Sequence, residues 1–356
     1  MITNTVQLGV IGAGWWATEA HIPGILAHPN SRLVALCDPH AGRLAEAASA
    51  YNIKKTYSDY REMLEREELD AAIVVTPHAT HYELGRACLE RGLHLLVEKP
   101  MTLYARDARD LVHAAKARGL ALATGYNHNF TPQALRAHQV MQEGELGQVE
   151  YLDSIFASDM TQFLGGNVSR DHPPVRSSFK VHGPSENYNN PQLLGGGQGH
   201  LQLTHSVGLL FYVTGLRARR VQAHMNVLGR KVDMVDAFSV SFENGAVGQV
   251  GGTGNSGPGH RMALTVYCQD GCILIDSLAQ MAFIRGKDGR NENLMELGGG
   301  QVSRYPATTN FINVILGREE SRATGENAWR AVELLDAAYR SAAQDGQPVD
   351  VEDLYR

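Results

Sequence analysis

The first third of the chain alternates between short apolar runs and amphipathic segments. The pattern predicts buried strands at 6–12, 32–38, 69–77, 94–100 and 120–126, with a short edge strand beginning at Tyr57. Helices are predicted at 18–28, 40–53, 61–68, 82–92 and 105–119. Strands that are apolar throughout and alternate with helices are typical of a parallel sheet covered on both faces. We therefore expect an α/β, doubly wound Rossmann domain over residues 1–127.

The pattern changes after residue 127. A helix is predicted at 131–144 and a strand at 148–156, followed by a long polar loop at 157–194 and a helix that starts from a glycine-rich turn within 195–215. Alternating strands follow at 219–227, 236–254, 261–276 and 281–286, with hairpin turns at the Asn-Gly and Asp-Gly pairs 244–245 and 270–271. Two helices, 310–316 and 326–344, end the chain. Residues 128–356 are thus expected to form an α+β domain with a mostly antiparallel sheet and helices on one face.

Composition narrows the class of protein. A length of 356 residues suits two domains of about 150 residues each. A net charge of −6 without a long basic run argues against a nucleic-acid partner. No apolar segment approaches the roughly 20 residues that span a bilayer, so no membrane association is expected. The N-terminus lacks a signal-peptide pattern, and four cysteines are too few for a disulfide framework. These features predict a cytoplasmic protein.

The most specific local pattern is GxGxxA, which runs from Gly12 to Ala17 between a strand and a helix. Gly12 permits the tight turn, and Gly14 lets the backbone approach a pyrophosphate. Asp38 ends the second strand about 20 residues later, where a ribose-binding carboxylate is expected. Because a carboxylate accepts from a 2′-hydroxyl and repels a 2′-phosphate, we expect NAD rather than NADP, although Arg43 could lean back toward Asp38. The alternative is the same turn in a doubly wound fold without a cofactor.

A second pattern lies between Val74 and Pro100. A Thr-Pro pair ends one strand, a histidine follows within a few residues, and Glu-Lys-Pro ends the next strand. Together with the GxGxxA run, this resembles the Gfo/Idh/MocA family, that of glucose–fructose oxidoreductase and inositol dehydrogenase. The resemblance is strongest over residues 6–130 and in the helix that contains Gly195 to His205.

The resemblance implies roles for residues at the strand ends. Lys99 would contact the reacting hydroxyl and help to move its proton, and a cis peptide bond before Pro100 would fix its angle. The cofactor side would include Glu98 as an acceptor, Thr76 and His81 near the ribose, and Asn127 near the nicotinamide. Each of these four could also be an ordinary strand-end or capping residue. We further expect one of Trp15 and Trp16 to line the nicotinamide pocket and the other to cover the first helix.

The helix after the glycine-rich turn departs from the family pattern. In the family an Asp and a His stand four residues apart on one helix face, and the histidine takes the hydroxyl proton with help from the carboxylate. Here His205 matches the histidine, but Leu201 stands in place of the Asp. Gln202 lies on the same side and could hydrogen-bond the substrate or the imidazole. In the alternative interpretation, His205 is a core histidine between Leu201 and Leu209.

A substitute carboxylate could come from the long loop, where the candidates are Asp159, Asp171 and Glu186. His172 and His182 are expected to be surface or substrate-contact residues rather than zinc ligands. Cys268 and Cys272 lack paired zinc-ligand spacing and are expected to be reduced core thiols. No metal site is predicted.

These observations favour an NAD-dependent oxidoreductase that acts on a secondary hydroxyl of a sugar, sugar acid or cyclitol. An alternative is an enzyme that uses bound NAD for transient oxidation, in glycoside cleavage or epimerisation. A cofactor-binding regulator without turnover is a third hypothesis, against which the intact Lys99 argues. The C-terminal strands carry apolar residues that one helix layer would leave uncovered, and the family pairs subunits through this sheet. We therefore expect a homo-oligomer, either a dimer or a tetramer.

Overall fold

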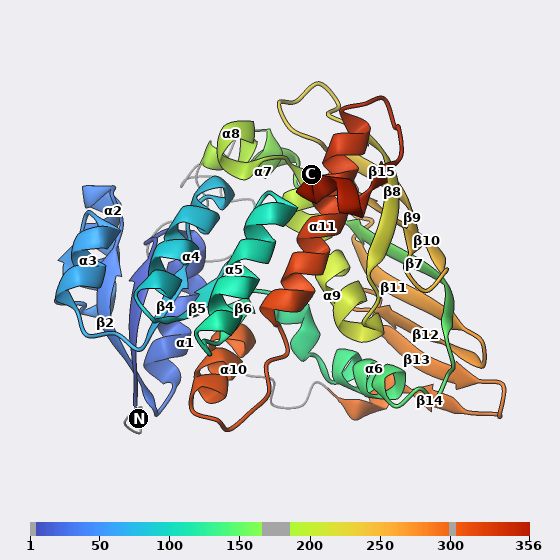
Figure 1. The fold of residues 1–356 in the computed structure, drawn as a ribbon, viewed down its shortest axis with the longest axis horizontal. Helices are drawn as coiled ribbons and strands as arrows, with labels where there is room; N and C mark the ends of the chain where they lie inside the picture. Colours follow the sequence, from blue (N-terminus) through green and yellow to red (C-terminus); the bar gives the residue numbers. More distant parts are fainter. Residues whose placement is uncertain (1–4, 166–185, 299–303) are drawn as a thin grey trace.

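Six short parallel strands form the first of two sheets in the computed structural model, which describes residues 5–165, 186–298 and 304–356 (Figure 1). The spatial order is β3-β2-β1-β4-β5-β6. The strands are β1 Val6–Ile11, β2 Ser31–Cys37, β3 Thr56–Tyr57, β4 Ala71–Val74, β5 His94–Val97 and β6 Leu122–Thr124. The predicted doubly wound order is confirmed, with its switch point between β1 and β4, where ligands bind in such sheets.

The helices between these strands lie close to their predicted ranges. They are α1 Ile22–Ala27, α2 Ala41–Tyr51, α3 Tyr60–Arg66, α4 His81–Glu90 and α5 Ala105–Ala117. The predicted helix 18–28 differs in form, because it opens as a π-helix, η1 (Ala17–His21), before α1. Short 3₁₀ turns follow β4 and β6, namely η2 (His78–Thr80) and η3 (Asn127–Phe130). These strand-to-helix junctions place polar side chains at the carboxyl edge of the sheet.

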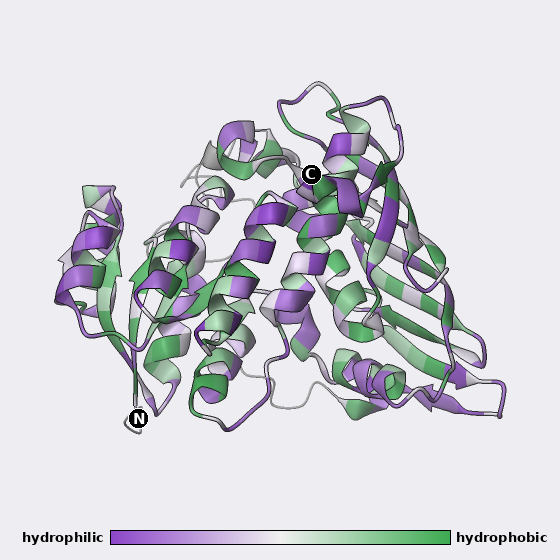
Figure 2. Cartoon of the chain, viewed as in Figure 1, coloured by the Kyte–Doolittle hydropathy of each residue, from purple (hydrophilic) through white to green (hydrophobic). Residues whose placement is uncertain are grey.

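The second sheet has nine strands in the order β14-β13-β12-β11-β7-β10-β9-β8-β15. All neighbours are antiparallel except β7 and β10, which pair in parallel, so the prediction of a mostly antiparallel sheet is confirmed. The strands are β7 Val149–Ala157, β8 Ala218–Asn226, β9 Val235–Phe242, β10 Val247–Thr253, β11 Arg261–Cys268, β12 Gly271–Asp276, β13 Met281–Gly286, β14 Asn291–Asn293 and β15 Val349–Asp350. Figure 2 shows hydrophobic and hydrophilic positions alternating along these strands, as expected for a sheet with one covered face.

Within the described residues, helices cover one face of this sheet (Figure 1). They are α6 Pro132–Gln142, α9 Thr204–Thr214 and α11 Gly325–Ala342. The first turn before α9 is a π-helix, η5 (Gly199–Leu203), so the helix of the glycine-rich segment is continuous from residue 199 to 214. Two 3₁₀ turns complete this half, η6 (Leu294–Leu297) and η7 (Val351–Tyr355).

The predicted loop 157–194 is more structured than expected. Its described parts contain α7 Thr161–Leu164, η4 Glu186–Asn189 and α8 Pro191–Leu194. Each of the two α-helices is a single turn, which is too short for hydrophobic periodicity to reveal. Asp171, His172 and His182 lie outside the described residues.

The end of the chain returns to the first sheet. Helix α10 (Pro306–Ile315) starts four residues before the predicted position, with Pro306 at its first turn. It packs against α1, β5 and β6, and α11 packs against α5. The Thr124 amide donates to the Ala323 carbonyl at 2.9 Å, joining the sheet edge to the C-terminal segment. The domain division at residue 127 stays a prediction, because these late helices contact both halves.

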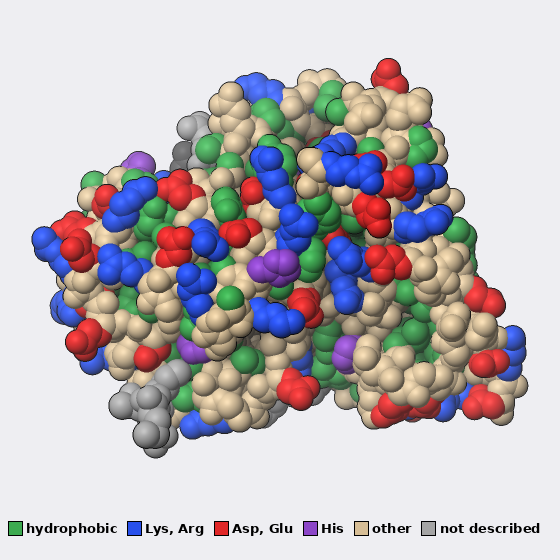
Figure 3. Space-filling model, in the orientation of Figure 1, with side chains coloured by type: hydrophobic (Ala, Val, Ile, Leu, Met, Phe, Trp, Pro, Cys, Tyr) green, Lys and Arg blue, Asp and Glu red, His purple; other side chains and the backbone are tan. Residues whose placement is uncertain are grey.

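The surface seen in Figure 3 mixes Lys and Arg with Asp and Glu side chains, without a large area of one charge. Within the described residues, no helix combines the length and the apolar character needed to cross a membrane.

Candidate active site

The GxGxxA turn has the clearances that a dinucleotide requires. Gly12 has a φ of 105°, and a Cβ there would lie 2.1 Å from the Val75 carbonyl oxygen, so only glycine fits. A Cβ on Gly14 would meet nothing within 4 Å, so the backbone at Gly14 faces open space. A phosphate group can therefore approach the chain at the start of the helix, as expected for the predicted cofactor.

Asp38 closes this turn from the second strand. Its Oδ2 accepts from the Ala13 amide at 2.8 Å, and its Oδ1 accepts from the His40 amide at 2.8 Å. Arg43 does lean back, with Nε 3.3 Å from Asp38 Oδ2. The carboxylate is thus fixed beside the turn with a guanidinium next to it, and its contact with the ribose stays a prediction.

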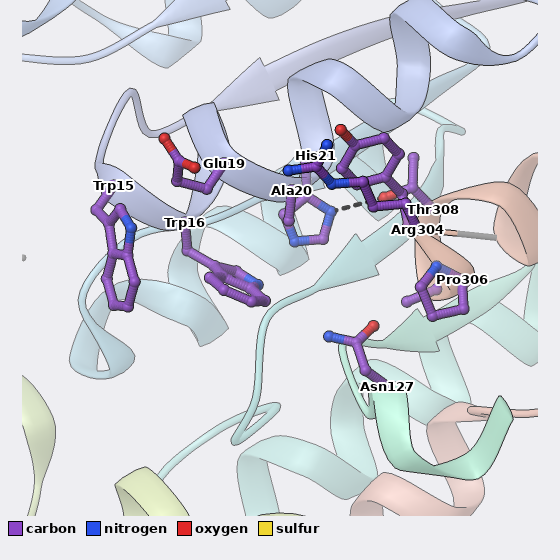
Figure 4. Close-up of a pocket in the computed structure, with 11 residues that line it drawn as sticks. Trp15, Trp16, Glu19, Ala20, His21, Asn127, Arg304, Pro306 and Thr308 are labelled. Atoms are coloured by element: carbon purple, nitrogen blue, oxygen red, sulfur yellow. Dashed lines mark hydrogen bonds between the residues drawn. The ribbon is translucent and has the colours of Figure 1, made fainter. Parts of the chain in front are cut away.

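A cavity of about 360 Å³ lies beside the turn (Figure 4). It is lined by Trp15, Trp16 and Asn127, three residues predicted to lie on the cofactor side, and by residues 304–308 at the start of α10. Both tryptophans line this cavity, and Trp15 also packs against Phe163 with ring centroids 6.1 Å apart, while the contact of one tryptophan with the nicotinamide stays a prediction. The C-terminal segment therefore completes a wall that the first half of the chain begins.

Glu98 is an internal anchor of this wall. Its Oε1 accepts from Trp16 Nε1 at 3.0 Å and lies 2.9 Å from Nε2 of His21. The other ring nitrogen of His21 lies 2.9 Å from the Thr308 hydroxyl of α10, as Figure 4 shows. Burial raises the pKa of Glu98, but His21 and Lys99 outweigh it and hold the pKa below its usual range. An ionised Glu98 thus links the cofactor turn, the Lys99 strand and α10, and its role as a cofactor acceptor stays a prediction.

The turn that carries Lys99 is braced by His81. The Lys99–Pro100 peptide bond is cis, as the resemblance implied. The buried ring of His81 lies with Nδ1 2.8 Å from the Pro100 carbonyl and Nε2 2.8 Å from the Thr76 carbonyl. The Thr76 hydroxyl accepts from that of Thr80 at 2.8 Å. Contact of Thr76 and His81 with the ribose stays a prediction. For His81 the structure does not favour it, because carbonyl oxygens occupy both ring nitrogens.

Lys99 points at the helix of the glycine-rich segment. Its Nζ donates to the Leu201 carbonyl at 2.8 Å. Burial lowers the pKa of Lys99 to about 8, because the charged amine loses its hydration, and the nearby Glu98 carboxylate limits the fall. The amine therefore titrates near neutral pH.

His205 lies on this helix among aromatic rings, within range of the Lys99 charge. Its ring centroid lies 5.3 Å from that of His128, 6.1 Å from Phe156 and 6.5 Å from Tyr126. Burial, then the Lys99 charge and then His128 hold the pKa of His205 well below its usual range. Burial and Lys99 lower the pKa of His128 to about 4. Both imidazoles are therefore neutral at neutral pH, and Nδ1 of His205 has no hydrogen-bond partner among the described residues.

Leu201 is part of a separate apolar cluster, formed by Met160, Phe163, Leu164, Leu201, Val232 and Met234. The neighbouring Gln202 donates from Nε2 to Met160 Sδ at 2.9 Å. Asp159 is exposed and accepts from the amide and hydroxyl of Thr161 at the start of α7. Among the described residues, then, no carboxylate hydrogen-bonds His205. Contacts of Gln202 and Asp159 with substrate stay predictions, as does any role of Glu186, whose side chain is not described.

Three residues of this site escaped prediction from the sequence. His21 contacts Glu98 across 77 positions, and Thr308 contacts His21 across 287. His128 is different, because it directly follows Asn127 at the end of β6, where side chains of parallel strands gather. Its position could have revealed it. Within the described residues, no cluster of three or more His, Cys, Asp or Glu side chains is arranged to hold a metal ion.

Comparison with known proteins agrees with this geometry. Residues 6–126 match the model of the oxidoreductase family with an NAD-binding Rossmann fold, GFO_IDH_MocA, and residues 134–274 match the GFO/IDH/MocA C-terminal domain. The chain is 24% identical to myo-inositol 2-dehydrogenase from Thermotoga maritima over 361 residues, covering 98% of this chain and 99% of that protein.

Solved structures share the fold over nearly the whole chain. An oxidoreductase domain protein from Kribbella flavida has a TM-score of 0.81 at 19% identity, covering 98% of this chain and 100% of that one. The WlbA dehydrogenase from Bordetella pertussis, solved with NADH and UDP-GlcNAcA, has a TM-score of 0.80 at 20% identity, covering 98% and 99%. Both family domains, the fold and the dinucleotide turn point the same way: this chain belongs to the Gfo/Idh/MocA oxidoreductase family, whose first domain is an NAD-binding Rossmann fold.

Proposed function

We propose that the protein is an NAD-dependent dehydrogenase that moves a hydride between the nicotinamide and a secondary hydroxyl of a sugar, sugar acid or cyclitol. The observation that carries the proposal is the convergence of Lys99, His128 and His205, whose side chains lie close enough to shift one another's pKa, with His128 directly after Asn127 of the cavity wall. These groups offer a proton acceptor and hydrogen-bond partners for a hydroxyl at the carboxyl edge of the sheet.

Bound NAD would supply the acceptor for the hydride that leaves the carbon bearing the hydroxyl. The residues of the chain must then take the hydroxyl proton. Lys99 is suited to this step because its pKa of about 8 leaves a useful fraction of neutral amine at neutral pH. The neutral His205 would hold the hydroxyl oriented toward Lys99. In the reverse direction the Lys99 ammonium returns the proton to the carbonyl oxygen as it becomes a hydroxyl.

This division of work differs from the family pattern implied by the sequence. There the histidine is the base and a carboxylate one turn earlier supports it. Here Leu201 sits in an apolar cluster, and the pKa of His205 lies far below neutral. A weakly basic imidazole is a poor proton acceptor, so the role passes to Lys99.

The substrate class rests on relatives. One relative is a myo-inositol 2-dehydrogenase, and another, 28% identical over 42% of this chain, is the D-glucoside 3-dehydrogenase of Escherichia coli. The neutral imidazoles of His128 and His205 suit the several hydroxyl groups of such compounds, because a neutral ring can both donate and accept. All four cysteines are free thiols, which supports a cytoplasmic setting.

The test is a panel of polyols, hexoses, uronates and glycosides incubated with NAD, with reduced nicotinamide measured by absorbance. We expect at least one compound to give net NADH with the wild-type protein and at least about 100-fold less with Lys99→Ala. A protein that purifies with tightly held NAD and gives no net NADH, yet converts a glycoside, would instead support the transient-oxidation alternative.

We also propose that the face of the second sheet that the described helices leave uncovered joins two copies of the chain. Val247, Tyr151 and Tyr267 are direct neighbours on β10, β7 and β11, and are 52%, 37% and 49% exposed. The helices cover the opposite face (Figure 1). Contiguous exposed apolar side chains on a sheet are typical of subunit interfaces, which supports a homo-oligomer with closed symmetry.

A further inference from the structure

A buried carboxylate near the second sheet accepts hydrogen bonds from backbone amides of the glycine-rich turn. Asp233 lies just before β9 and is 5% exposed. Its Oδ1 accepts from the Gly197 amide at 2.7 Å, and its Oδ2 accepts from the Gly199 amide at 2.8 Å. The Tyr339 hydroxyl of α11 donates to Oδ1 at 2.9 Å. Three donors thus converge on the two oxygens of one side chain.

The close approach of Asp233 and Tyr339 explains why three positions of the turn are glycine. A Cβ on Gly197 would lie 2.2 Å from the backbone oxygen of Asp233. Cβ atoms on Gly196 and Gly199 would lie 2.1 and 2.6 Å from the Tyr339 hydroxyl. Any larger residue would push the turn away from Asp233 and Tyr339. Gly196, Gly197 and Gly199 therefore allow close contact with the Tyr339 side chain and the Asp233 backbone.

Asp233 caps the helix that carries His205. This helix starts at Gly199 and runs to residue 214, and neither η5 nor α9 has a side-chain cap of its own. The first amides of a helix need acceptors, and a negative charge there is favourable. Asp233 supplies both from a segment more than thirty positions away in the chain.

The same contacts lead to Lys99. The Leu201 amide donates to the Gly197 carbonyl at 2.8 Å, so Leu201 is held by the residue that Asp233 holds. The Leu201 carbonyl accepts from Lys99 Nζ at 2.8 Å. A shift of Gly197 would therefore move the acceptor of the Lys99 amine and tilt the first turns of the helix.

We propose that Asp233 is a positioning residue of the active site: by binding the Gly197 and Gly199 amides it fixes the Leu201 carbonyl, and through that carbonyl the place of the Lys99 amine. The inference rests on the proposed function, in which Lys99 takes the hydroxyl proton. It requires no contact between Asp233 and the substrate.

Asp236 offers a matched control. It is 3% exposed and neighbours Asp233, and burial followed by the Asp233 charge raises the pKa of Asp236 well above its usual range. It makes no hydrogen bond to the glycine-rich turn within the described residues. Because Asp236 hydrogen-bonds Asp233, Asp236→Asn is chosen to keep an N–H donor for Asp233, and it removes no contact to the turn.

The first experiment compares kcat and the Kd for NAD in the wild type, Asp233→Asn and Asp236→Asn. An amide has one acceptor oxygen where the carboxylate has two, so Asp233→Asn leaves a turn amide without its acceptor. We expect kcat to fall at least about tenfold in Asp233→Asn, because small displacements of reacting groups are costly. The Kd for NAD should change less than about threefold in both variants, and kcat should stay within about twofold in Asp236→Asn. Wild-type kcat in folded Asp233→Asn, or an equal loss in both variants, would overturn the proposal.

The second experiment needs no substrate. Lys99 in the NAD-bound protein is labelled with a limiting amount of an amine-specific anhydride across a pH series, and its modification is measured by mass spectrometry. The wild-type midpoint is expected at about 8. In Asp233→Asn the midpoint should rise by at least about one unit, because the released amine regains water, whereas Asp236→Asn should leave it in place. An unchanged midpoint in Asp233→Asn contradicts the positioning role, even if no substrate is ever found.

If Asp233→Asn fails to fold, Tyr339→Phe takes its place in both experiments. It removes one of the three donors to Asp233 and keeps the ring. A smaller rise in the labelling midpoint of Lys99 supports the proposal, and no change in midpoint or kcat contradicts it.

Discussion

The pH dependence of turnover should report the titration of Lys99. A lysine with the ordinary pKa of 10.5 is neutral in roughly one molecule in 3,000 at pH 7, whereas a pKa of about 8 makes it neutral in about one in ten. Burial thus raises the population of the neutral amine by a factor of about 300. Oxidation needs the neutral amine, so its rate should rise with pH. The reverse reaction needs the ammonium, so its rate should fall with pH.

The assay is the initial rate of NADH formation at saturating NAD and substrate, from about pH 6 to about pH 10. We expect kcat to rise about tenfold per unit at low pH and to level off above about pH 8. Lys99→Ala should lose the rise together with at least about 100-fold of activity. Lys55→Ala removes a surface lysine that pairs with Glu67, and as the control it should keep the wild-type profile.

Two results would refute this reasoning. A midpoint near 10.5 would mean that the amine is not desolvated during turnover. A pH profile that survives in Lys99→Ala would assign the proton transfer to another group, with His205 or His128 the nearest candidates.

Three further predictions concern the rest of the account. Leu201→Asp places a carboxyl in the apolar cluster, so it should lower the unfolding free energy by about 2–4 kcal/mol in thermal denaturation and leave the pH profile of kcat in place. A shifted midpoint of that profile would show instead that the new carboxylate reaches the proton-transfer groups. NAD should bind at least about tenfold more tightly than NADP in tryptophan-fluorescence titrations, since a 2′-phosphate beside Asp38 costs more than about 1.4 kcal/mol, and equal affinities would count against this role of Asp38. Light scattering at micromolar concentration should give a dimer or tetramer, and Tyr267→Glu should weaken it; a wild-type monomer would rule out the proposed interface.

Local chemistry in the sequence was enough to predict the dinucleotide turn and the cofactor class. Gly12 and Gly14 lie where a turn between a strand and a helix demands glycine, and Asp38 follows at the spacing of the next strand end. Lys99 could be predicted because the residues around it form a motif in consecutive positions. The doubly wound order follows from the same alternation of strands and helices.

The long-range contacts behind the site could not be predicted in this way. Asp233 acts through amides more than thirty positions earlier, and His21 and Thr308 meet across almost the whole chain. Hydrophobic periodicity carries no information on such pairs. The direction of the Leu201 side chain was also hidden, because the helix begins as a π-helix, whose wider turn shifts side chains from the α-helical positions.

The most direct test of the central claim is hydride transfer itself. A compound that gives NADH in the panel is prepared with deuterium on the carbon that bears the reacting hydroxyl. The mass of the NADH formed is then measured by mass spectrometry. The account predicts one deuterium in each reduced nicotinamide formed by the wild-type protein, and at least about 100-fold less product with Lys99→Ala. Reduced nicotinamide without the label, or labelled product at the wild-type rate in Lys99→Ala, would contradict it.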